Sequence, residues 1–366
     1  PQLVSSAETN RTDEAQKAYP MSLRTKEQLV LTNIYHWYRN GVSTTNLLMP
    51  FDTDSLTTTR DYSGYSNDGT VLGATWTKDG VVGGACFFDG DGVITIPDDP
   101  SLDGNGTWSE ISIEFWVKTA APLHGTRIVA KKVASASTGS YMVGFQTSMG
   151  DPANTVFWGV NNGTGWQDIW NTTTTVLETG KWYQVVCTYK SGPGLTIYIN
   201  GIQRVNRPLT GNITRDPSGE PLFLGYDGGG TANRYLNGTL DEVRIYPMAL
   251  TPAQIFQRYI ETKGGLSNSS TIVPQETTAS DEWRCEVIPN DSWQDGTART
   301  SETLTVLAAG ENSRPRIDVY TPSDTTVEVN EGASLEFTQM SSDPNNDTLT
   351  YSWILDDVEQ ATGQNW

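Results

Sequence analysis

Short runs of alternating hydrophobic and polar residues make up most of residues 47–250, and turns rich in Gly, Asn and Asp separate them. The runs 111–118 and 182–189 both repeat every two residues. This period indicates strands with one buried face, and many short strands between such turns indicate an antiparallel sandwich or barrel. The dipeptide Asn200-Gly201 predicts a hairpin turn, because both residues tolerate positive φ.

A single helix is predicted, at about 252–263. Thr251 and Gln254 form a capping box at its start, and Gly264 follows its last turn. The strand pattern before it runs straight into this helix, which carries apolar residues on one face.

The passage GTLDEVRIYPMALTPAQIFQRYI at 238–260, with NDGTV, FDGDG, EFWVKT and IYINGI upstream, closely resembles a laminin-G-like domain of the concanavalin type. The resemblance implies a concanavalin-like antiparallel jelly-roll sandwich over residues 46–267. It also implies a binding module, not an enzyme. We therefore predict an all-β chain in which this sandwich is combined with immunoglobulin-like β-sandwich domains.

The segments on either side of the sandwich each hold too few strands to bury a face alone, but together they supply the strand count of an immunoglobulin-like domain. Trp37 would be its core tryptophan and Cys285 its late-strand cysteine. We predict that 21–45 and 268–308 form this discontinuous domain and that the sandwich is inserted into it. The alternative is an irregular N-terminal tail followed by a small separate β-module.

The two ends of the chain are predicted separately. Residues 1–20 are polar without periodicity, so a disordered or irregular lead is expected. The pattern from Asp343 to Trp353 resembles polycystic-kidney-disease-type or cadherin-like domains, and 313–366 would be part of one. Trp366 falls within a strand-like pattern, so we expect a piece of a longer chain.

The composition is acidic, with 43 Asp plus Glu against 24 Lys plus Arg in 366 residues and a net charge of −19. Such a surface repels phosphate backbones, which argues against nucleic-acid partners, and it favours divalent cations. Few charges and abundant Thr, Ser, Asn and Gly suit an extracellular or cell-surface β-protein. No apolar run is long enough for a membrane span, and Cys86 and Cys187, each in an apolar strand pattern, are expected to be buried free thiols and not a disulfide.

Concanavalin-type sandwiches also include glucan hydrolases, which carry a catalytic pair of carboxylates. Enzymes resembling laminarinases carry Glu-x-Asp-x-Glu on one strand, but here Ser112 lies between Glu110 and Glu114 where that family has Asp. We expect Glu110 and Glu114 to be solvated carboxylates on an outer strand face. His36 and His124 lie in different predicted domains, so no catalytic residues are predicted.

Oxygen-rich turns point to a possible structural Ca²⁺. The passage 61–69 resembles the DxSGxxNxG turn of laminin-G-like domains, and Asp61, Asn67 and Asp241 are its candidate ligands. The alternative is a metal-free network of Asx turns. A second acidic cluster, near an interdomain junction, offers further candidate ligands: Asp343, Asn345, Asn346 and Asp347.

Candidate ligand-binding residues are concentrated in FWGVNNGTGWQDIWN, residues 157–171. Aromatic faces beside amide and carboxylate groups suit stacking on sugar rings with hydrogen bonds to their hydroxyls. The candidates are Trp166, Trp170, Asn162 and Asp168, whereas Trp158 is predicted to be structural. The alternative is that both tryptophans plug the sandwich's concave face.

Nine Asn-x-Ser/Thr sequons suggest a secreted glycoprotein, although Thr-rich and Asn-rich turns also produce sequons by chance. They are Asn10, Asn105, Asn162, Asn171, Asn212, Asn237, Asn268, Asn290 and Asn346. The chain is therefore predicted to be a non-catalytic, multidomain extracellular protein for adhesion or for binding a glycan or protein. The alternatives are an accessory region of a larger secreted glycoside hydrolase and a structural spacer in a surface stalk or filament. The sequence leaves self-assembly open.

Overall fold

The computed structural model describes the chain in separate stretches, and every structural statement below concerns these residues. They are 2–6, 10–19, 32–55, 57–104, 107–132, 139–146, 152–170, 176–215, 219–229, 234–265, 270–308, 315–322, 335–343, 348–355 and 358–362.

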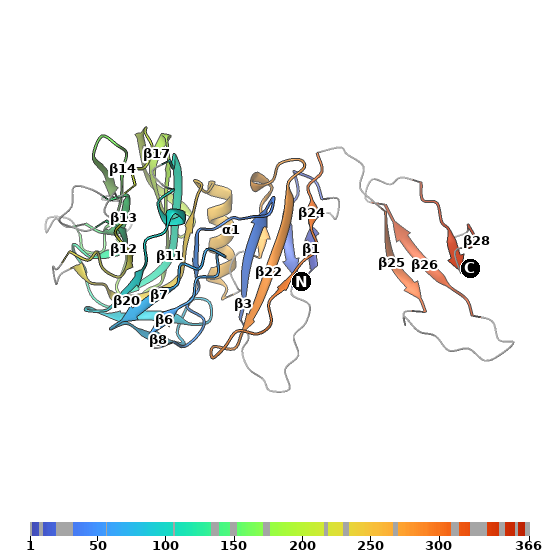
Figure 1. The fold of residues 1–366 in the computed structure, drawn as a ribbon, viewed down its shortest axis with the longest axis horizontal. Helices are drawn as coiled ribbons and strands as arrows, with labels where there is room; N and C mark the ends of the chain where they lie inside the picture. The colour runs from blue at the N-terminus through green and yellow to red at the C-terminus, as the bar shows by residue number, and fades with distance from the viewer. Residues whose placement is uncertain are drawn as a thin grey trace.

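Two eight-stranded antiparallel sheets form the sandwich (Figure 1). The first has the order β18-β17-β16-β11-β20-β9-β8, with β5 also paired to β20. Its strands are β5 (Leu47–Met49), β8 (Thr75–Thr77), β9 (Ala85–Asp89), β11 (Glu110–Thr119), β16 (Tyr183–Lys190), β17 (Gly192–Ile199), β18 (Ile202–Leu209) and β20 (Asn237–Tyr246).

The second sheet has the order β15-β14-β13-β12-β19-β10-β7-β6. Its strands are β6 (Thr58–Thr59), β7 (Gly69–Leu72), β10 (Val93–Ile96), β12 (Arg127–Lys131), β13 (Tyr141–Phe145), β14 (Val156–Asn161), β15 (Trp166–Trp170) and β19 (Leu222–Leu224). Side chains alternate along the strands as predicted, so each sheet turns one apolar face toward the other. The core between the sheets includes Ile113, Phe115, Trp158 and Cys187. The all-β prediction and the structural role of Trp158 are thereby confirmed.

Helix α1 (Pro252–Lys263) covers the outer face of the first sheet. Its capping box between Thr251 and Gln254 is present, as predicted. The Trp116 indole donates to Thr262 Oγ1 at 3.0 Å and stacks on Tyr259. The prediction of a solvated outer strand face is therefore wrong here, because the helix removes that face from water.

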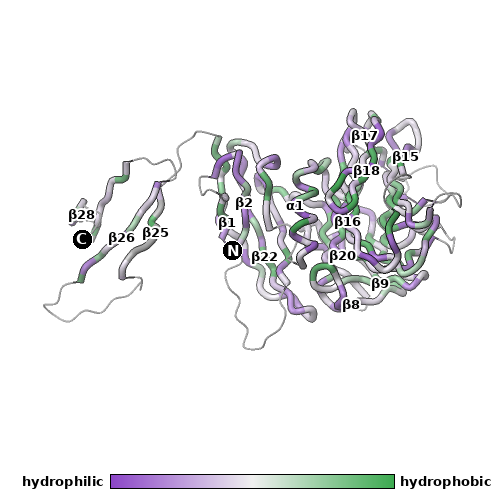
Figure 2. The backbone as a smooth tube through the Cα atoms, turned by 180° about the vertical axis from the view of Figure 1, so that it is seen from behind, coloured by the Kyte–Doolittle hydropathy of each residue, from purple (hydrophilic) through white to green (hydrophobic). Residues whose placement is uncertain are grey.

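Two segments far apart in sequence, β3 (Thr32–Arg39) and β22 (Glu282–Asn290), lie side by side beyond the helix (Figure 1). They are antiparallel in one register from Arg39–Trp283 to Thr32–Asn290. Strands β4 (Val42–Ser43), β23 (Arg299–Thr300) and β24 (Leu304–Thr305) complete this five-stranded flanking sheet. Figure 2 shows from behind that α1 lies between the sandwich and β22.

A three-stranded sheet packs near this flanking sheet, with the order β1-β2-β21. Its strands are β1 (Gln2–Ser5), β2 (Gln16–Tyr19) and β21 (Thr271–Ile272), and Ala18 and Ile272 share a core with Trp37, Trp283 and Cys285. The expectation of an irregular lead over residues 1–20 is therefore wrong for β1 and β2. Strands of four residues are too short to show a period in the sequence.

The remaining described elements lie outside these sheets. The 3₁₀ turns are η1 (Pro100–Leu102) and η4 (Pro274–Glu276), and two hairpins near the C-terminus pair β25 (Arg316–Thr321) with β26 (Thr338–Ser342) and β27 (Trp353–Leu355) with β28 (Val358–Ala361). All three cysteines are buried free thiols, as predicted for Cys86 and Cys187. Burial raises the pKa of the Cys86 thiol to about 12, which makes it unreactive.

Candidate ligand-binding site

The β14–β15 hairpin presents both candidate tryptophans on the outward face of the second sheet. In its register Phe157 lies opposite Trp170, Gly159 opposite Asp168, and Asn161 opposite Trp166. Because strand side chains alternate, these residues share the face that points away from the core. We call the outward side chains of β12–β15 and the adjoining Lys132 the tryptophan face: Arg127, Lys132, Met142, Phe157, Trp166, Asp168 and Trp170. Within it Trp166, Asp168 and Trp170 are at least partly exposed, whereas the other four side chains are buried.

The Trp166 indole lies directly on the backbone of β14. A Cβ atom at Gly159 would come within 2.6 Å of the indole, so only glycine permits this approach. Lys132 Nζ lies 5.0 Å from the centre of the Trp166 ring, a distance suited to cation–π attraction. These two contacts, with Gly159 and Lys132, together fix the orientation of the indole.

The opposite end of the tryptophan face is held by an arginine. The Arg127 guanidinium lies 4.8 Å from the centre of the Phe157 ring, and its Nε lies 3.7 Å from the Asp227 carboxylate. Burial is the main cause that lowers the pKa of Arg127 to about 10, and the nearby charge of Arg234 adds to it. Trp170, opposite Phe157, is 40% exposed and so can contact a ligand.

Two polar candidates differ in their availability to a ligand. No donor among the described residues reaches the Asp168 carboxylate, which lies between the two tryptophans along β15 and can accept hydrogen bonds from outside. Asn162 is 8% exposed; its Nδ2 donates to Thr210 O, and its Oδ1 accepts from Thr164. Asn162 therefore stabilises the hairpin turn, and its side-chain amide is already engaged there. Contact between Asn162 and a ligand stays a prediction, which these contacts disfavour.

Arg127, Lys132 and Phe157 are not among the ligand-binding residues predicted from the sequence. A signal for them exists, because Ala130, Met142 and Phe157 make the outward positions of β12–β14 apolar and form a small cluster of their own. Strands that are apolar on both faces indicate a second covered or binding surface. Arg127 lies beside a bulge in β12 between Arg127 and Val129, which the sequence pattern does not reveal.

The calcium candidates Asp61 and Asp241 lie in separate hydrogen-bond networks. The Asp61 carboxylate accepts from Leu48 N, Ser63 N, Ser63 Oγ and Asn67 N at 2.6–2.9 Å. Asn67 Nδ2 donates to Asn46 O and Ser101 Oγ. These contacts match the Asx-turn alternative and leave Asp61 little capacity to bind a cation.

Asp241 is fully buried, and its Oδ2 accepts from the backbone amides of Val81 and Val82. Its Oδ1 has no hydrogen-bond partner in the described structure. Burial, followed by the nearby charges of Glu242 and Asp52, raises the pKa of Asp241 well above its usual range. Within the described stretches, no three His, Cys, Asp or Glu side chains are arranged to hold a metal ion.

Only one residue of the second candidate calcium cluster lies within the described residues. Asp343 follows β26 and is buried, whereas Asn345, Asn346 and Asp347 lie outside the described residues. Calcium binding at either cluster stays a prediction.

The carboxylates of Glu110 and Glu114 both bind other groups of the protein. Glu110 pairs with Lys190 at 2.6 Å and accepts from Ala249 N. Glu114 is 1% exposed beneath α1, where it accepts from Gln184 Nε2 at 2.7 Å and from Tyr246 OH at 2.9 Å. The prediction that Glu114 is solvated is wrong, and its burial leaves no route for a polysaccharide to reach it.

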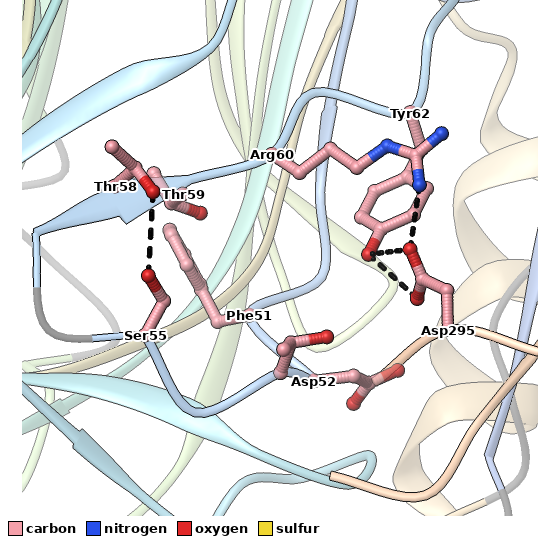
Figure 3. Close-up of a pocket in the computed structure, with 9 residues that line it drawn as sticks. Phe51, Asp52, Ser55, Thr58, Thr59, Arg60, Tyr62 and Asp295 are labelled. Atoms are coloured by element: carbon pink, nitrogen blue, oxygen red, sulfur yellow. Dashed lines mark hydrogen bonds and ion pairs between the residues drawn. The ribbon is translucent and has the colours of Figure 1, made fainter. Parts of the chain in front are cut away.

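A small cavity of about 190 Å³ lies where the sandwich meets the loop after β22 (Figure 3). Asp295 lies at one side, where it pairs with Arg60 at 2.6 Å and accepts from Tyr62 OH at 3.0 Å. Its lining is Phe51, Asp52, Thr53, Ser55, Thr58, Thr59, Arg60, Tyr62 and Asp295.

The sequons differ in accessibility. Asn212 is exposed, Asn10 and Asn237 are half-buried, and Asn162 and Asn290 are buried. Asn290 Nδ2 donates to Thr53 Oγ1 at 2.6 Å, so its amide is committed within the fold. The others, Asn105, Asn171, Asn268 and Asn346, lie outside the described residues.

The sandwich is similar in sequence to a known family and to a known receptor. Residues 88–256 match the family model of the concanavalin A-like lectin/glucanases superfamily, of the laminin G type. Over 117 residues the chain is 32% identical to human adhesion G-protein coupled receptor D1, covering 31% of this chain and 13% of the receptor. The chain thus spans only a small part of that relative's length.

Solved structures with a similar fold include domain 4 of AbnA, an extracellular arabinanase from Geobacillus stearothermophilus, in complex with arabinotriose. It is 21% identical with a TM-score of 0.45 and covers 58% of this chain and 97% of its own. The binding domain of Paraclostridial Mosquitocidal Protein 1 is 16% identical with a TM-score of 0.47, covering 59% of this chain and 52% of its own. No described helix of the present chain could cross a membrane.

Proposed function

We propose that this chain is a non-catalytic extracellular binding protein and that its tryptophan face engages a carbohydrate. The observation that carries the proposal is the pair Trp166 and Trp170 on one outward strand face, with the Asp168 carboxylate, which accepts from no donor among the described residues, between them. Four residues along a strand separate the Cα atoms of the two tryptophans by about 13 Å. This spacing suits an extended oligosaccharide, whose rings can stack on each indole while its hydroxyls donate to the carboxylate.

Rigidity supports the same proposal. The Trp166 indole rests on Gly159 and is contacted by Lys132, so little side-chain entropy is lost when a ligand binds. The burial of Glu114 and the internal pairing of Glu110 argue against hydrolysis by that pair. The match to a lectin-containing superfamily agrees with binding, although that superfamily includes glucanases as well.

We further infer that the sandwich, 46–267, is inserted into an immunoglobulin-like domain formed by 21–45 and 268–308. The pairing of β3 with β22 and the shared core of Trp37, Trp283 and Cys285 support this layout. A small apolar cluster of Ile34, Leu48, Tyr62 and Ile288 joins the flanking sheet to the sandwich. The layout would present the tryptophan face away from the flanking sheets.

The test is binding of the full chain to an array of immobilised neutral and anionic oligosaccharides. We expect Trp166→Ala with Trp170→Ala to weaken the best binding by about tenfold or more, since each stacked ring contributes about 0.5–1.5 kcal/mol beyond its burial. Tyr65→Ala is the matched control, because Tyr65 is an aromatic residue of similar exposure (41%) on a distant turn. Equal binding by the parent and the double variant would refute the proposal.

A further inference from the structure

The loop between β22 and β23 exposes an isolated tryptophan. Trp293 is 76% exposed, more than any other large hydrophobic residue in the described structure. A tryptophan indole favours burial, so an exposed one with a fixed backbone is a recurrent feature of binding surfaces.

The backbone on both sides of Trp293 is fixed by hydrogen bonds. Asp291 Oδ1 accepts from Trp293 N at 3.0 Å and from Gln294 N at 2.9 Å. Asn290 Oδ1 accepts from Ser292 N at 2.7 Å, and Gly296 N donates to Pro289 O at 2.7 Å. The loop is therefore ordered before any ligand arrives, which lowers the entropy cost of binding.

The same loop is attached to the sandwich. Ser292 O accepts from Asp54 N at 2.9 Å, and Asp295 is held by Arg60 and Tyr62. Asp295 lines the 190 Å³ cavity, and two residues of chain span at most about 7 Å. The Trp293 backbone therefore lies beside the cavity, although Trp293 is not one of the residues that line it.

The cavity offers hydroxyl groups across from Asp295. Ser55, Thr58 and Thr59 lie on that side in Figure 3, and Ser55 and Thr58 share one long hydrogen bond of 3.4 Å. Hydroxyls can both donate and accept, so they suit a ligand rich in hydroxyls.

From these observations we propose a second ligand site, formed by Trp293 and the junction cavity, that takes a neutral saccharide. A saccharide ring has one apolar face for the indole and polar edges for the hydroxyls and carboxylates. An apolar partner would need a contiguous apolar patch, but the residues next to Trp293 are Asp291, Ser292, Gln294 and Asp295. The one cation in the cavity's described lining, Arg60, is already paired with Asp295, and the chain has a net charge of −19, so an anionic ligand is disfavoured.

This inference shares with the proposed function only the choice of a saccharide as ligand, since the two sites have no residue in common. The probes are neutral and anionic oligosaccharides on the array, followed by calorimetric titration of the best neutral binder. We expect Trp293→Ala to weaken binding of at least one neutral oligosaccharide by about tenfold. Trp293→Tyr, which retains an aromatic face, should restore most of that affinity.

Circular dichroism and the melting temperature must first show that each variant is folded, and Tyr19→Ala serves as the control because Tyr19 is an exposed aromatic residue on β2. If Trp293→Ala binds every neutral oligosaccharide as tightly as the parent does, the second site is refuted. If only anionic glycans are affected, the assigned ligand class is wrong. Loss on Trp293→Ala without loss on the Trp166/Trp170 double variant would support this site and refute the tryptophan face.

Discussion

A disulfide across the β3–β22 pair provides the most direct test of the nested layout. Tyr38 and Arg284 are opposite each other in the register, and the Arg284 guanidinium lies 5.6 Å from the Tyr38 ring, so both side chains share one face. Directly opposed residues of antiparallel strands have Cα atoms about 4.5–5.5 Å apart. Disulfides require about 4.4–6.8 Å. Tyr38→Cys with Arg284→Cys should therefore form a bridge under mild oxidation.

The bridge would close a loop of roughly 250 residues, for which the chain-entropy model gives a stabilisation of about 5 kcal/mol, an upper value for engineered bridges. We expect faster migration on non-reducing electrophoresis, loss of two titratable thiols, and a melting temperature that falls when reductant is added. The three native cysteines are buried and should not interfere.

The matched control pairs Tyr38→Cys with Glu282→Cys, two residues along β22. That diagonal separates the Cα atoms by about 7–8 Å, beyond the disulfide range. If the Tyr38/Arg284 variant folds but stays reduced, or the control bridges equally well, the two strands are not paired in this register and the layout is wrong.

Three further predictions concern charge, metal and glycans. Burial raises the pKa of Asp52 from 3.8 to about 7, so the folded state holds an extra proton and the free energy of unfolding should fall as pH rises from about 4 to 8. In urea titrations at pH 5 and pH 8, Asp52→Asn should reduce the difference in unfolding free energy between the two pH values by up to a few kcal/mol. An unchanged difference would contradict the assignment of the extra proton to Asp52. If Asp241 binds Ca²⁺, a chelator should lower the melting temperature of the parent but not of Asp241→Asn, and a parent insensitive to the chelator would refute calcium binding. In a secretory host, peptide mass mapping should find glycan at Asn212 and not at Asn162, whereas occupancy of the buried Asn162 would contradict the fold.

Local signals were sufficient for several elements. The capping box placed helix α1 at 252–263, and Asn200-Gly201 forms the predicted turn with φ values of 53° and 75°. Both depend on contacts within a few residues, so the sequence around them carries all the information. The outer surface of β11 could not be predicted in the same way, because its burial depends on a helix more than a hundred residues later in the chain.

The candidate site shows the same division. Trp166, Trp170 and Asp168 share one strand face simply because their spacing is even, and that follows from the sequence. Lys132 and Arg127 join them only because β12 and β13 lie beside β14 in the folded sheet. The calcium prediction paired Asp61 with Asp241 from the order of strands, and the register places them in different networks.

The amino-acid sequence alone determined the alternating strands of the sandwich, the helix, the Asn200-Gly201 turn and the resemblance of the middle of the chain to concanavalin-type sandwiches, since each is set by periodicity or by contacts between near neighbours. Only the tertiary structure decided which faces meet. It brought β3 to β22, buried Glu114 beneath α1, and left Trp293 exposed beside the junction cavity. Strand pairing and burial depend on residues hundreds of positions apart, and a local pattern cannot specify its distant partner.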